Sequence, residues 1–484
     1  MTDRYAVGPM LAVIGAVVGC LVGPRLGPGA ATTALLGAVV GAGFCGFRAA
    51  RVGRSTVAAV VVLAAAALSA RAHDGVRRSP FAGAVAEAAT LTLSGRAIDD
   101  ADPGRFSASV LIRAGAGAAG FRTVLVRAAG DEATRLARVQ AGDAVVVRGR
   151  VAPLRDPFDR RARLRHAVAR LEGARLLAFA PPEGIRATVE VVRSRVLRGV
   201  AGLAPAHRGL LAGFLLGETR EVPAAVVADF RASGLSHLLA VSGANVAFVL
   251  AVADPFLRRL RLGARTTFAL GLVAAFAVMT RGEPSVLRAS ALAGLSVLAV
   301  AAGRPTNRVR LLAYAVAGLL LVDPFLVRSP GFWLSVGASG GIVLWAPTIE
   351  RRLRGPAPVR TALAVSLAAQ LGVAPVLAVA IGSVPAVTPL ANLAVAPVAE
   401  LLGTVGLVLA VGAGYIPVLG PIGRPFVSAL LIWVSGVARV GAAVPLTLDR
   451  KGTAVVLGGA AVLGLGASVA CRRGSRARTR TPTR

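Results

Sequence analysis

Long apolar runs alternate with short basic linkers along most of the chain, and they predict membrane-spanning helices. Three runs come first, at Met10–Val22, Ala31–Phe47 and Thr56–Ala70. Eight more follow residue 206, near Thr267–Thr280, Pro284–Ala302, Leu311–Val322, Phe332–Trp345, Ala362–Ala380, Leu390–Val411, Phe426–Val444 and Ala454–Cys471. With one further apolar stretch, Ala232–Ala253, the pattern predicts an α-helical polytopic membrane protein of about twelve spans.

Between residues 71 and 205 the pattern changes to short runs in which apolar and polar residues alternate. The runs are Leu91–Ile98, Phe106–Ala114, Phe121–Ala128, Ala144–Val151 and Leu171–Phe179. Gly and Asp separate them, as is typical of turns between strands. About five short strands at this spacing predict a small inserted β-domain, for which an OB-like barrel is the natural candidate.

The segment from Ile185 to Leu203 predicts an amphipathic helix at the membrane surface. Valines recur there at helical spacing and arginines occupy the polar face: Val189, Val192, Val196 and Val200 against Arg186, Arg193 and Arg198. The chain therefore divides into four parts: a three-helix membrane block (1–70), the β-domain with its amphipathic helix (71–205), a second membrane block (206–471) and a basic tail (472–484).

Composition and charge give the class and the orientation of the protein. Hydrophobic residues make up 55% of the 484 residues, charged residues 16%, and the formal net charge is +32. A soluble protein could not bury so many apolar runs, so a soluble class is excluded. Arginines gather in alternate linkers, at Arg48, Arg51 and Arg54, at Arg258, Arg259, Arg261 and Arg265, at Arg304, Arg308 and Arg310, and at Arg351, Arg352, Arg354 and Arg360. Short basic loops stay in the cytoplasm, which predicts a multi-pass cell-membrane protein with both termini inside and the β-domain outside.

The stretch Ala232–Ala253 combines spanning length with polar residues. If it is one helix, His237, Ser242 and Asn245 share an arc of roughly 140°. Polar groups at membrane depth usually face a cavity or another helix, so this arc predicts a polar interior path. Gly243, with Ser242, is the expected place for a bend.

Four more polar residues in the second membrane block are candidates for the same path. Arg288 lies one turn inside its run, where a functional role and snorkelling to the outer interface are equally open. Gln370 and Asn392 are expected to contact substrate or to form interhelical hydrogen bonds. Glu400 shares a helical face with Asn392 and, at that depth, needs a partner, water or a proton.

Cysteine and histidine give no sign of a metal or cofactor site. The cysteines are Cys20, Cys45 and Cys471, and the histidines are His73, His166, His207 and His237. None has the spacing of a metal-binding motif, so we expect no metal, no cofactor and no disulfide framework.

Several stretches, in order, resemble the ComEC competence proteins, which are membrane channels for DNA uptake. They are Gly213-Phe214-Leu215-Leu216-Gly217-Glu218, then GLSHLLAVSGANV, TRGEPSVLRASALAG, PGFWLSVGASGGI and AAQLGVAPVLAVAIGSVPAVTPLANLAVAPV. The resemblance covers about Ala206 to Cys471, and it implies that single-stranded DNA crosses the inner membrane through this block. His237, Ser242, Gly243, Asn245, Arg288, Gln370 and Asn392 carry over as members of these motifs.

The resemblance also implies partners: a DNA receptor outside, an ATP-driven DNA motor inside, and the lipid bilayer, with a homo-oligomer left open. Many relatives add a metallo-β-lactamase-like nuclease domain with an HxHxDH motif, which the four histidines of this chain cannot form. We therefore expect a channel without nuclease activity. Two alternatives stay open, a transporter of another substrate and a membrane enzyme that uses His237 with Ser242.

Overall fold

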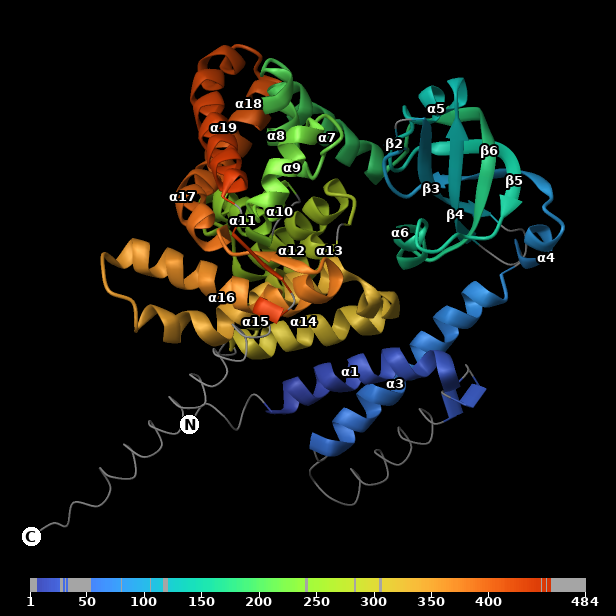
Figure 1. Cartoon of the computed structure of the whole chain (residues 1–484), viewed down its shortest axis with the longest axis horizontal. Coiled ribbons are helices and arrows are strands. Elements are labelled where there is room, and N and C mark those ends of the chain that lie inside the picture. Colours follow the sequence, from blue (N-terminus) through green and yellow to red (C-terminus); the bar gives the residue numbers. More distant parts are fainter. Residues whose placement is uncertain are drawn as a thin grey trace, which may run out of the picture. The chain divides into compact units, whose positions relative to one another are not determined.

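The computed structural model describes residues 7–26, 29–30, 32–33, 54–79, 81–104, 106–115, 121–239, 243–282, 284–303, 307–444, 446–449 and 451–453. Helices make up most of the chain, and one small β-domain interrupts them (Figure 1). The chain forms two compact units. The first comprises Met1–Pro223, His237–Phe332 and Ala399–Ile432, and the second Ala224–Ser236, Trp333–Val398 and Trp433–Arg484.

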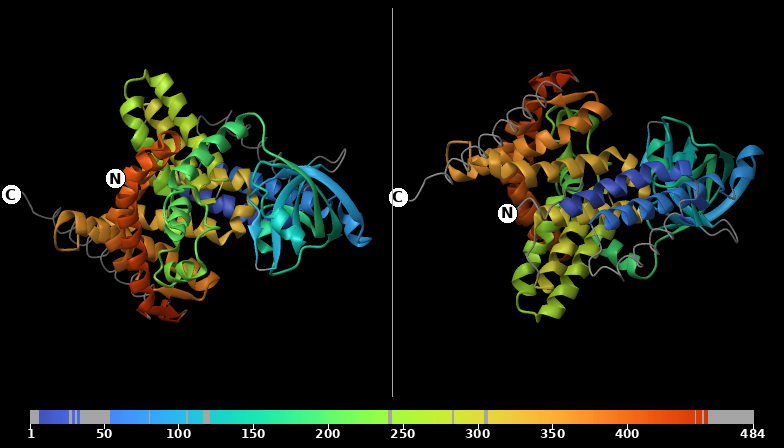
Figure 2. Two further views of the ribbon diagram at one scale, coloured as in Figure 1. Left: turned by 90° about the horizontal axis from the view of Figure 1, so that it is seen from above. Right: turned by 90° about the horizontal axis from the view of Figure 1, so that it is seen from below.

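Two of the three N-terminal runs are helices that pack side by side (Figure 2): α1 (Val7–Leu26) and α3 (Arg54–Arg77). Their backbones approach closely, because a Cβ on Gly19 or Gly23 of α1 would collide with the backbone of α3. Helix α3 continues past its predicted end at Ala70. Most of the predicted run Ala31–Phe47 lies outside the described residues.

The β-domain forms a small β-barrel-like sheet, and all five predicted strands are present. The strands are β1 (Thr90–Ala97), β2 (Asp102–Pro103), β3 (Ser107–Gly115), β4 (Phe121–Ala129), β5 (Ala144–Ala152) and β6 (Ala167–Ala180). Their order is β1-β5-β6-β4-β3-β2, and β1 also pairs with β3, which closes the five longer strands on themselves. Paired strands are antiparallel except β4 and β6, which are parallel.

Alternation along the strands explains the core of this barrel. One face of each strand points inward and supplies side chains such as Val110, Ile112, Val124 and Val147, each at most 2% exposed. Burial of one such side chain contributes about 1.5–3 kcal/mol. Short helices α4 (Phe81–Ala86) and α5 (Asp131–Leu136) add Phe81 and Leu136 to this core.

A third short helix, α6 (Arg160–Leu164), covers part of the outside of the barrel (Figure 1). Leu111 of β3 and Leu125 of β4 lie on the outward face, yet they are buried against Ala162 of α6 and Leu154 of the preceding loop. The carboxylate of Asp159 accepts a hydrogen bond of 2.7 Å from the Arg155 amide and so closes this loop. The outer surface of β3 and β4 is therefore occupied by the chain itself.

The predicted amphipathic helix is confirmed as α7 (Ile185–Val200). It packs closely against α18 (Leu407–Tyr415), since a Cβ on Gly199 would collide with the carbonyl of Ala410. Placing Arg193 on its polar face was wrong. The Arg193 residue is only 2% exposed, because carboxylates and carbonyl groups inside the fold neutralise its guanidinium.

The stretch Ala232–Ala253, for which the sequence left a helix conditional, is interrupted by a turn at Gly234. The described residues form α9 (Ala224–Ala232), the single turn α10 (Ser236–Leu239) and α11 (Gly243–Leu257). Gly234 has a φ of +77°, a conformation that favours glycine, and it separates α9 from α10. The residues between α10 and α11, including Ser242, lie outside the described residues, so the predicted bend at Ser242 and Gly243 stays a prediction.

The remaining helices correspond to the later apolar runs. In chain order they are α8 (Pro205–Leu216), α12 (Leu262–Met279), α13 (Pro284–Ala301), α14 (Arg308–Val322), η2 (Pro324–Arg328), α15 (Pro330–Glu350), α16 (Ala357–Ala380), α17 (Thr388–Leu401), the π-helix η3 (Leu402–Gly406) and α19 (Leu419–Ala443). Seven helices among the described residues are long and apolar enough to cross a membrane: Pro9–Leu26, Ala59–Val76, Leu262–Met279, Pro330–Glu350, Ala357–Ala380, Thr388–Tyr415 and Leu419–Ala443. These helices identify a membrane protein, and the last predicted run, Ala454–Cys471, lies outside the described residues.

Within the second unit, α15 and α16 meet along small residues. A Cβ on Gly337 or Gly341 of α15 would collide with the backbone of α16 at Gly372 and Ala368. Such close approach is how helices associate where lipid removes the hydrophobic driving force between them. A short pairing of β7 (Ser383–Pro385) with β8 (Thr447–Asp449) links the two ends of this unit.

Candidate functional site

The described residues of the expected polar arc differ in burial. His237 lies on α10 and is exposed, whereas Asn245 lies on α11 and is only 5% exposed. The Asn245 Nδ2 atom donates a hydrogen bond of 2.6 Å to the carbonyl of Phe214, near the end of α8. Ser242 lies outside the described residues. Asn245 therefore contacts a helix end, where free carbonyl groups need donors.

Asn245 and Arg288 are brought to neighbouring helices. Val246 of α11 packs in one apolar cluster with Val286 and Ala289 of α13, so the residues next to Asn245 and Arg288 touch. The Arg288 residue is 6% exposed. Since this side chain is enclosed by protein, its burial argues against snorkelling at the outer interface.

The other candidates are distributed over both units. Gln370 of α16 donates a hydrogen bond of 3.1 Å from Nε2 to the carbonyl of Pro385 in β7, within the second unit. Asn392 is half-buried on α17, also in the second unit. Glu400 lies on the same helix but is exposed and belongs to the first unit. Path-lining roles for these residues stay predictions.

A cluster of charged residues that the sequence did not indicate lies where α7, α8, α12 and the β-domain meet. It consists of three arginines and three acids: Arg193, Arg220 and Arg281 with Asp100, Glu190 and Glu218. Glu218 belongs to the GFLLGE stretch and Arg281 to the TRGEP stretch, which lie far apart in sequence. We refer to these six residues as the ionic cluster.

Arg193 is the centre of the ionic cluster. Its Nη2 atom lies 2.8 Å from Oε2 of Glu218 and 3.6 Å from Oδ2 of Asp100. Its Nη1 atom donates to the carbonyl of Met279 at 2.9 Å and of Leu216 at 3.3 Å, at the ends of α12 and α8. A cation is favourable at helix C-termini, because the helix dipole places partial negative charge there.

The acids of the cluster bridge the β-domain to the helices. Oδ1 of Asp100, in the loop after β1, lies 3.0 Å from Nη2 of Arg281, whose Nη1 lies 2.9 Å from Oε2 of Glu190 on α7. Arg281 also donates to the carbonyl of Ala141 in the β-domain at 3.3 Å. Arg220 holds Glu218 at 2.6 Å from Nε and 2.9 Å from Nη2.

Burial and charge act in opposite directions on the cluster. Burial by itself raises the pKa of Asp100, but Arg281, the Ala141 amide, Arg193 and Arg220 together hold this pKa below its ordinary value. Burial lowers the pKa of Arg193, and the neighbouring charge of Arg281 lowers it further. The hydrogen bond to Glu218 raises the pKa of Arg220. The three arginines and three acids balance in formal charge and pair with one another, which is the arrangement of a clamp between the β-domain and the helices.

A second junction uses two of the four histidines. The ring of His73 on α3 stacks on Phe325 with centroids 4.4 Å apart, and His166 of the β-domain lies at the same distance from this ring. The Nε2 atom of His166 lies 3.0 Å from Oδ1 of Asp323. These histidines therefore connect α3, the β-domain and η2.

The π-helix η3 interrupts the helical segment Thr388–Tyr415 and contacts α11. The ring of Phe248 on α11 presses against Gly403 so closely that a Cβ on Gly403 would collide with it. Leu211 of α8 approaches the same turn at Gly406. Single π-turns inside α-helices occur frequently at functional sites. The π-helix and Asn245 on the facing helix α11 are therefore candidates for a functional part of the first unit that moves.

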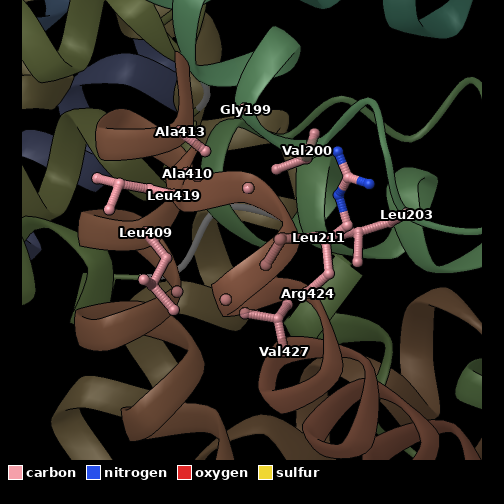
Figure 3. Close-up of a pocket in the computed structure, with 13 residues that line it drawn as sticks. Gly199, Val200, Leu203, Leu211, Leu409, Ala410, Ala413, Leu419, Arg424 and Val427 are labelled. Atoms are coloured by element: carbon pink, nitrogen blue, oxygen red, sulfur yellow. The ribbon is translucent and has the colours of Figure 1, made fainter. Parts of the chain in front are cut away.

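Figure 3 shows a small apolar cavity among α7, α8, η3, α18 and α19. Its volume is about 20 Å³, enough for one water molecule and far too small for a nucleotide. The guanidinium of Arg424 packs against Gly202 and lies beside Leu203 at its edge. This cavity is a packing defect and not a segment of a path. Among the residues that the structure describes, no group of three or more His, Cys, Asp or Glu could hold a metal ion.

Comparison with known proteins places the candidate residues inside one matched region of the sequence. The model of the Competence protein family matches residues 214–473. The chain is 27% identical over 205 residues to ComE operon protein 3 of Bacillus subtilis (strain 168), an alignment that covers 40% of this chain and 25% of that protein. No solved structure matches the chain.

Two uncharacterized proteins are also similar. YcaI of Escherichia coli (strain K12) is 28% identical over 218 residues, covering 42% of this chain and 28% of YcaI. A protein of Aquifex aeolicus (strain VF5) is 32% identical over 187 residues, covering 38% of this chain and 43% of that protein. In each case the alignment spans less than half of the relative.

Proposed function

The chain belongs to the competence protein family, whose model matches more than half of its residues, and we propose that it forms the channel through which single-stranded DNA crosses the cell membrane during natural transformation. The observation that carries the proposal is the position of the match. Residues 214–473 include five of the seven helices that are able to span a membrane. The family match thus covers most of the helices that are able to span a membrane.

The finer architecture is part of the same proposal. We propose about twelve spans with both termini in the cytoplasm, because the basic linkers alternate with the apolar runs in that order. We also propose that the β-domain is an OB-fold. The closed order of its five longer strands, with a single parallel pair between the third and the fifth, is the arrangement of that fold and supports the assignment.

DNA is the proposed substrate, and we propose that this chain acts on it as a channel. The support is the match of the Competence protein family model to residues 214–473, which include five of the seven helices able to span a membrane. A receptor outside and an ATP-driven motor inside are the partners such a channel needs, since a channel alone supplies no direction to transport. A homo-oligomer is compatible with the close helix packing within each unit.

Deletion of the gene, with complementation by the intact chain, tests the function. We expect loss of transformation by added DNA and full recovery on complementation, with membrane insertion verified in parallel. Normal transformation of the deletion strain would overturn the proposal and favour a transporter of another substrate. Nuclease activity in the purified intact chain would favour an enzyme instead.

A further inference from the structure

Two arginines of the β-domain face each other on the outside of the barrel. Arg96 of β1 and Arg113 of β3 are directly opposite in the strand register, and both are exposed. Opposite residues of antiparallel strands have Cβ atoms about 4.5–5.5 Å apart, and like charges at such positions destabilise a sheet. A pair of this kind persists without cost only where something else compensates its charge.

The acids of the β-domain do not provide that compensation. Within the described residues, neither Arg96 nor Arg113 forms an ion pair, and neither do Arg148 and Arg175, which lie directly opposite each other on β5 and β6. Arg150 is directly opposite Glu172 in the register. Arg175 lies near Glu132. The hydrogen bond from the Leu176 amide is the main cause of the lowered pKa of Glu132, and the charge of Arg175 also contributes. The Arg96–Arg113 pair is therefore an uncompensated positive site.

An exposed aromatic ring adjoins this pair. Phe121 at the start of β4 is 69% exposed and lies opposite Gly115, while Arg113 lies opposite Thr123 on the same strand. Phe121 and Arg113 are thus diagonal neighbours on the outer face, within reach of a long or aromatic side chain. A cation next to an unpaired ring is the combination that binds phosphate and stacks a base in single-stranded nucleic acid.

The usual ligand face of an OB-fold is not open here. Such folds bind oligonucleotides on the second and third strands, which correspond to β3 and β4. In this chain Leu111 and Leu125 of that face are buried under Ala162 of α6. A strand of DNA must therefore either displace α6 or bind at the edge of this face, where Arg96, Arg113 and Phe121 lie.

We propose that the surface formed by Arg96, Arg113 and Phe121 binds single-stranded DNA, with the two guanidinium groups on the phosphate backbone and a base stacked on Phe121. This inference rests on the proposed function for its ligand. The outward hydroxyl groups of Thr92 and Ser94 continue the surface along β1 toward Arg148, which lies opposite Thr92. Because outward residues recur about every 7 Å along a strand, the surface is long enough for several nucleotides.

The test uses the full chain in nanodiscs of zwitterionic lipid and a fluorescent oligothymidylate, with the Kd measured across salt concentrations. The double variant Arg96→Gln with Arg113→Gln removes two phosphate contacts. The negative slope of log K against log salt should therefore become less steep by about 1.4. Phe121→Leu should weaken binding about tenfold at every salt concentration, because stacking is not screened. Arg138→Gln with Arg160→Gln is the matched control, since both residues are exposed in the same domain, and its slope should equal that of wild type.

The thermal stability of the variants separates binding from folding. Removal of a like-charge pair should leave the melting temperature unchanged or higher, so weaker binding would not reflect unfolding. Equal loss of slope in the two double variants would overturn the proposal in favour of general charge attraction. Unchanged DNA binding, with a loss of binding to anionic lipid vesicles instead, would also overturn it.

The outcome is distinguishable from failure of the proposed function. If Arg96→Gln with Arg113→Gln binds DNA as the control does, while the deletion strain still fails to transform, the channel proposal stands and this surface is excluded. If the deletion strain transforms normally, the channel proposal fails, and the salt slopes still decide whether this surface binds DNA.

Discussion

The Nη2 atom of Arg193 lies 2.8 Å from Oε2 of Glu218, and the two side chains are 3% and 10% exposed. This buried pair joins α7 to the end of the GFLLGE stretch, and Asp100 extends it into the β-domain at 3.6 Å. A charge buried in this way is stable only with its partners. The ionic cluster is therefore the part of the first unit in which single substitutions should have the largest effects.

Arg193→Ala should destabilise the protein by about 3–5 kcal/mol, because it removes the buried cation shared by Glu218 and Asp100 and leaves two helix-end carbonyl groups without their donor, although Arg220 still pairs with Glu218. Thermal unfolding in detergent and abundance in membranes measure the loss. Arg208→Ala is the matched control, since it breaks a pair with Glu221 whose side chains are 36% and 54% exposed. That change should cost at most about 1 kcal/mol. Similar melting temperatures for the two variants would show that the cluster is not a clamp.

Asp100→Asn should lower stability near neutral pH and have less effect in acid. The pKa of Asp100 is held below its ordinary value of 3.8, so the folded state favours the charged form. The stability that this group contributes is present above the ordinary pKa and is lost as the pH falls through the folded pKa. Burial is the main cause of the raised pKa of Asp99 and of Asp143, and the charge of Asp100 contributes to both, so its removal partly relieves these two groups and makes the difference near neutral pH smaller. The difference in melting temperature between wild type and Asp100→Asn should become smaller as the pH is lowered toward about pH 3. A difference that stays constant would contradict this linkage.

Gly403→Ala should destabilise the π-helix by about 1–3 kcal/mol, because the added Cβ overlaps the ring of Phe248. Phe248→Ala removes the obstacle, so the double variant should lose less stability than the sum of the two single changes. Gly271→Ala is the control: nothing lies within 4 Å of its Cβ position, and a helical Gly→Ala change there should be neutral or stabilising. Additive losses would show that the two residues do not interact.

Reporter fusions check the topology. A reporter inserted at Gly130, in the turn before α5, should read as extracytoplasmic, and one in the Arg258–Arg265 linker as cytoplasmic. A fusion after Arg472, which lies outside the described residues, should also read as cytoplasmic. A cytoplasmic signal at Gly130 would reverse the placement of the β-domain.

Substitutions in the HLLAVSGAN stretch separate packing from transport. Asn245→Ala removes a buried hydrogen bond to Phe214, which costs about 0.6 kcal/mol on average in membranes, so we expect reduced protein abundance and a proportionate loss of DNA uptake. His237→Ala, Ser242→Ala and Gly243→Leu should reduce uptake at normal abundance if these residues line the path, with Gly243→Leu the most damaging because it adds bulk. Normal uptake in all three would remove the stretch from the path.

The sequence by itself was sufficient for the local elements. Alternation with a period of two identified all five longer strands of the β-domain, because each has one face in a common core. Valine spacing identified α7, and apolar length identified the helices able to span a membrane. Strand alternation, helical spacing and apolar length each depend only on residues that are close together in the sequence.

Only the tertiary structure decided how polar residues are paired. Nothing near Arg193 in sequence distinguishes it from Arg186 or Arg198, yet Arg193 is buried because α8, α12 and the β-domain bring Glu218, Met279 and Asp100 to it. Asn245 is buried because α8 brings the carbonyl of Phe214 to it, a contact that no pattern in the HLLAVSGAN stretch indicates. The free energy of a buried charge depends on which distant groups surround it, and only the folded chain determines those groups.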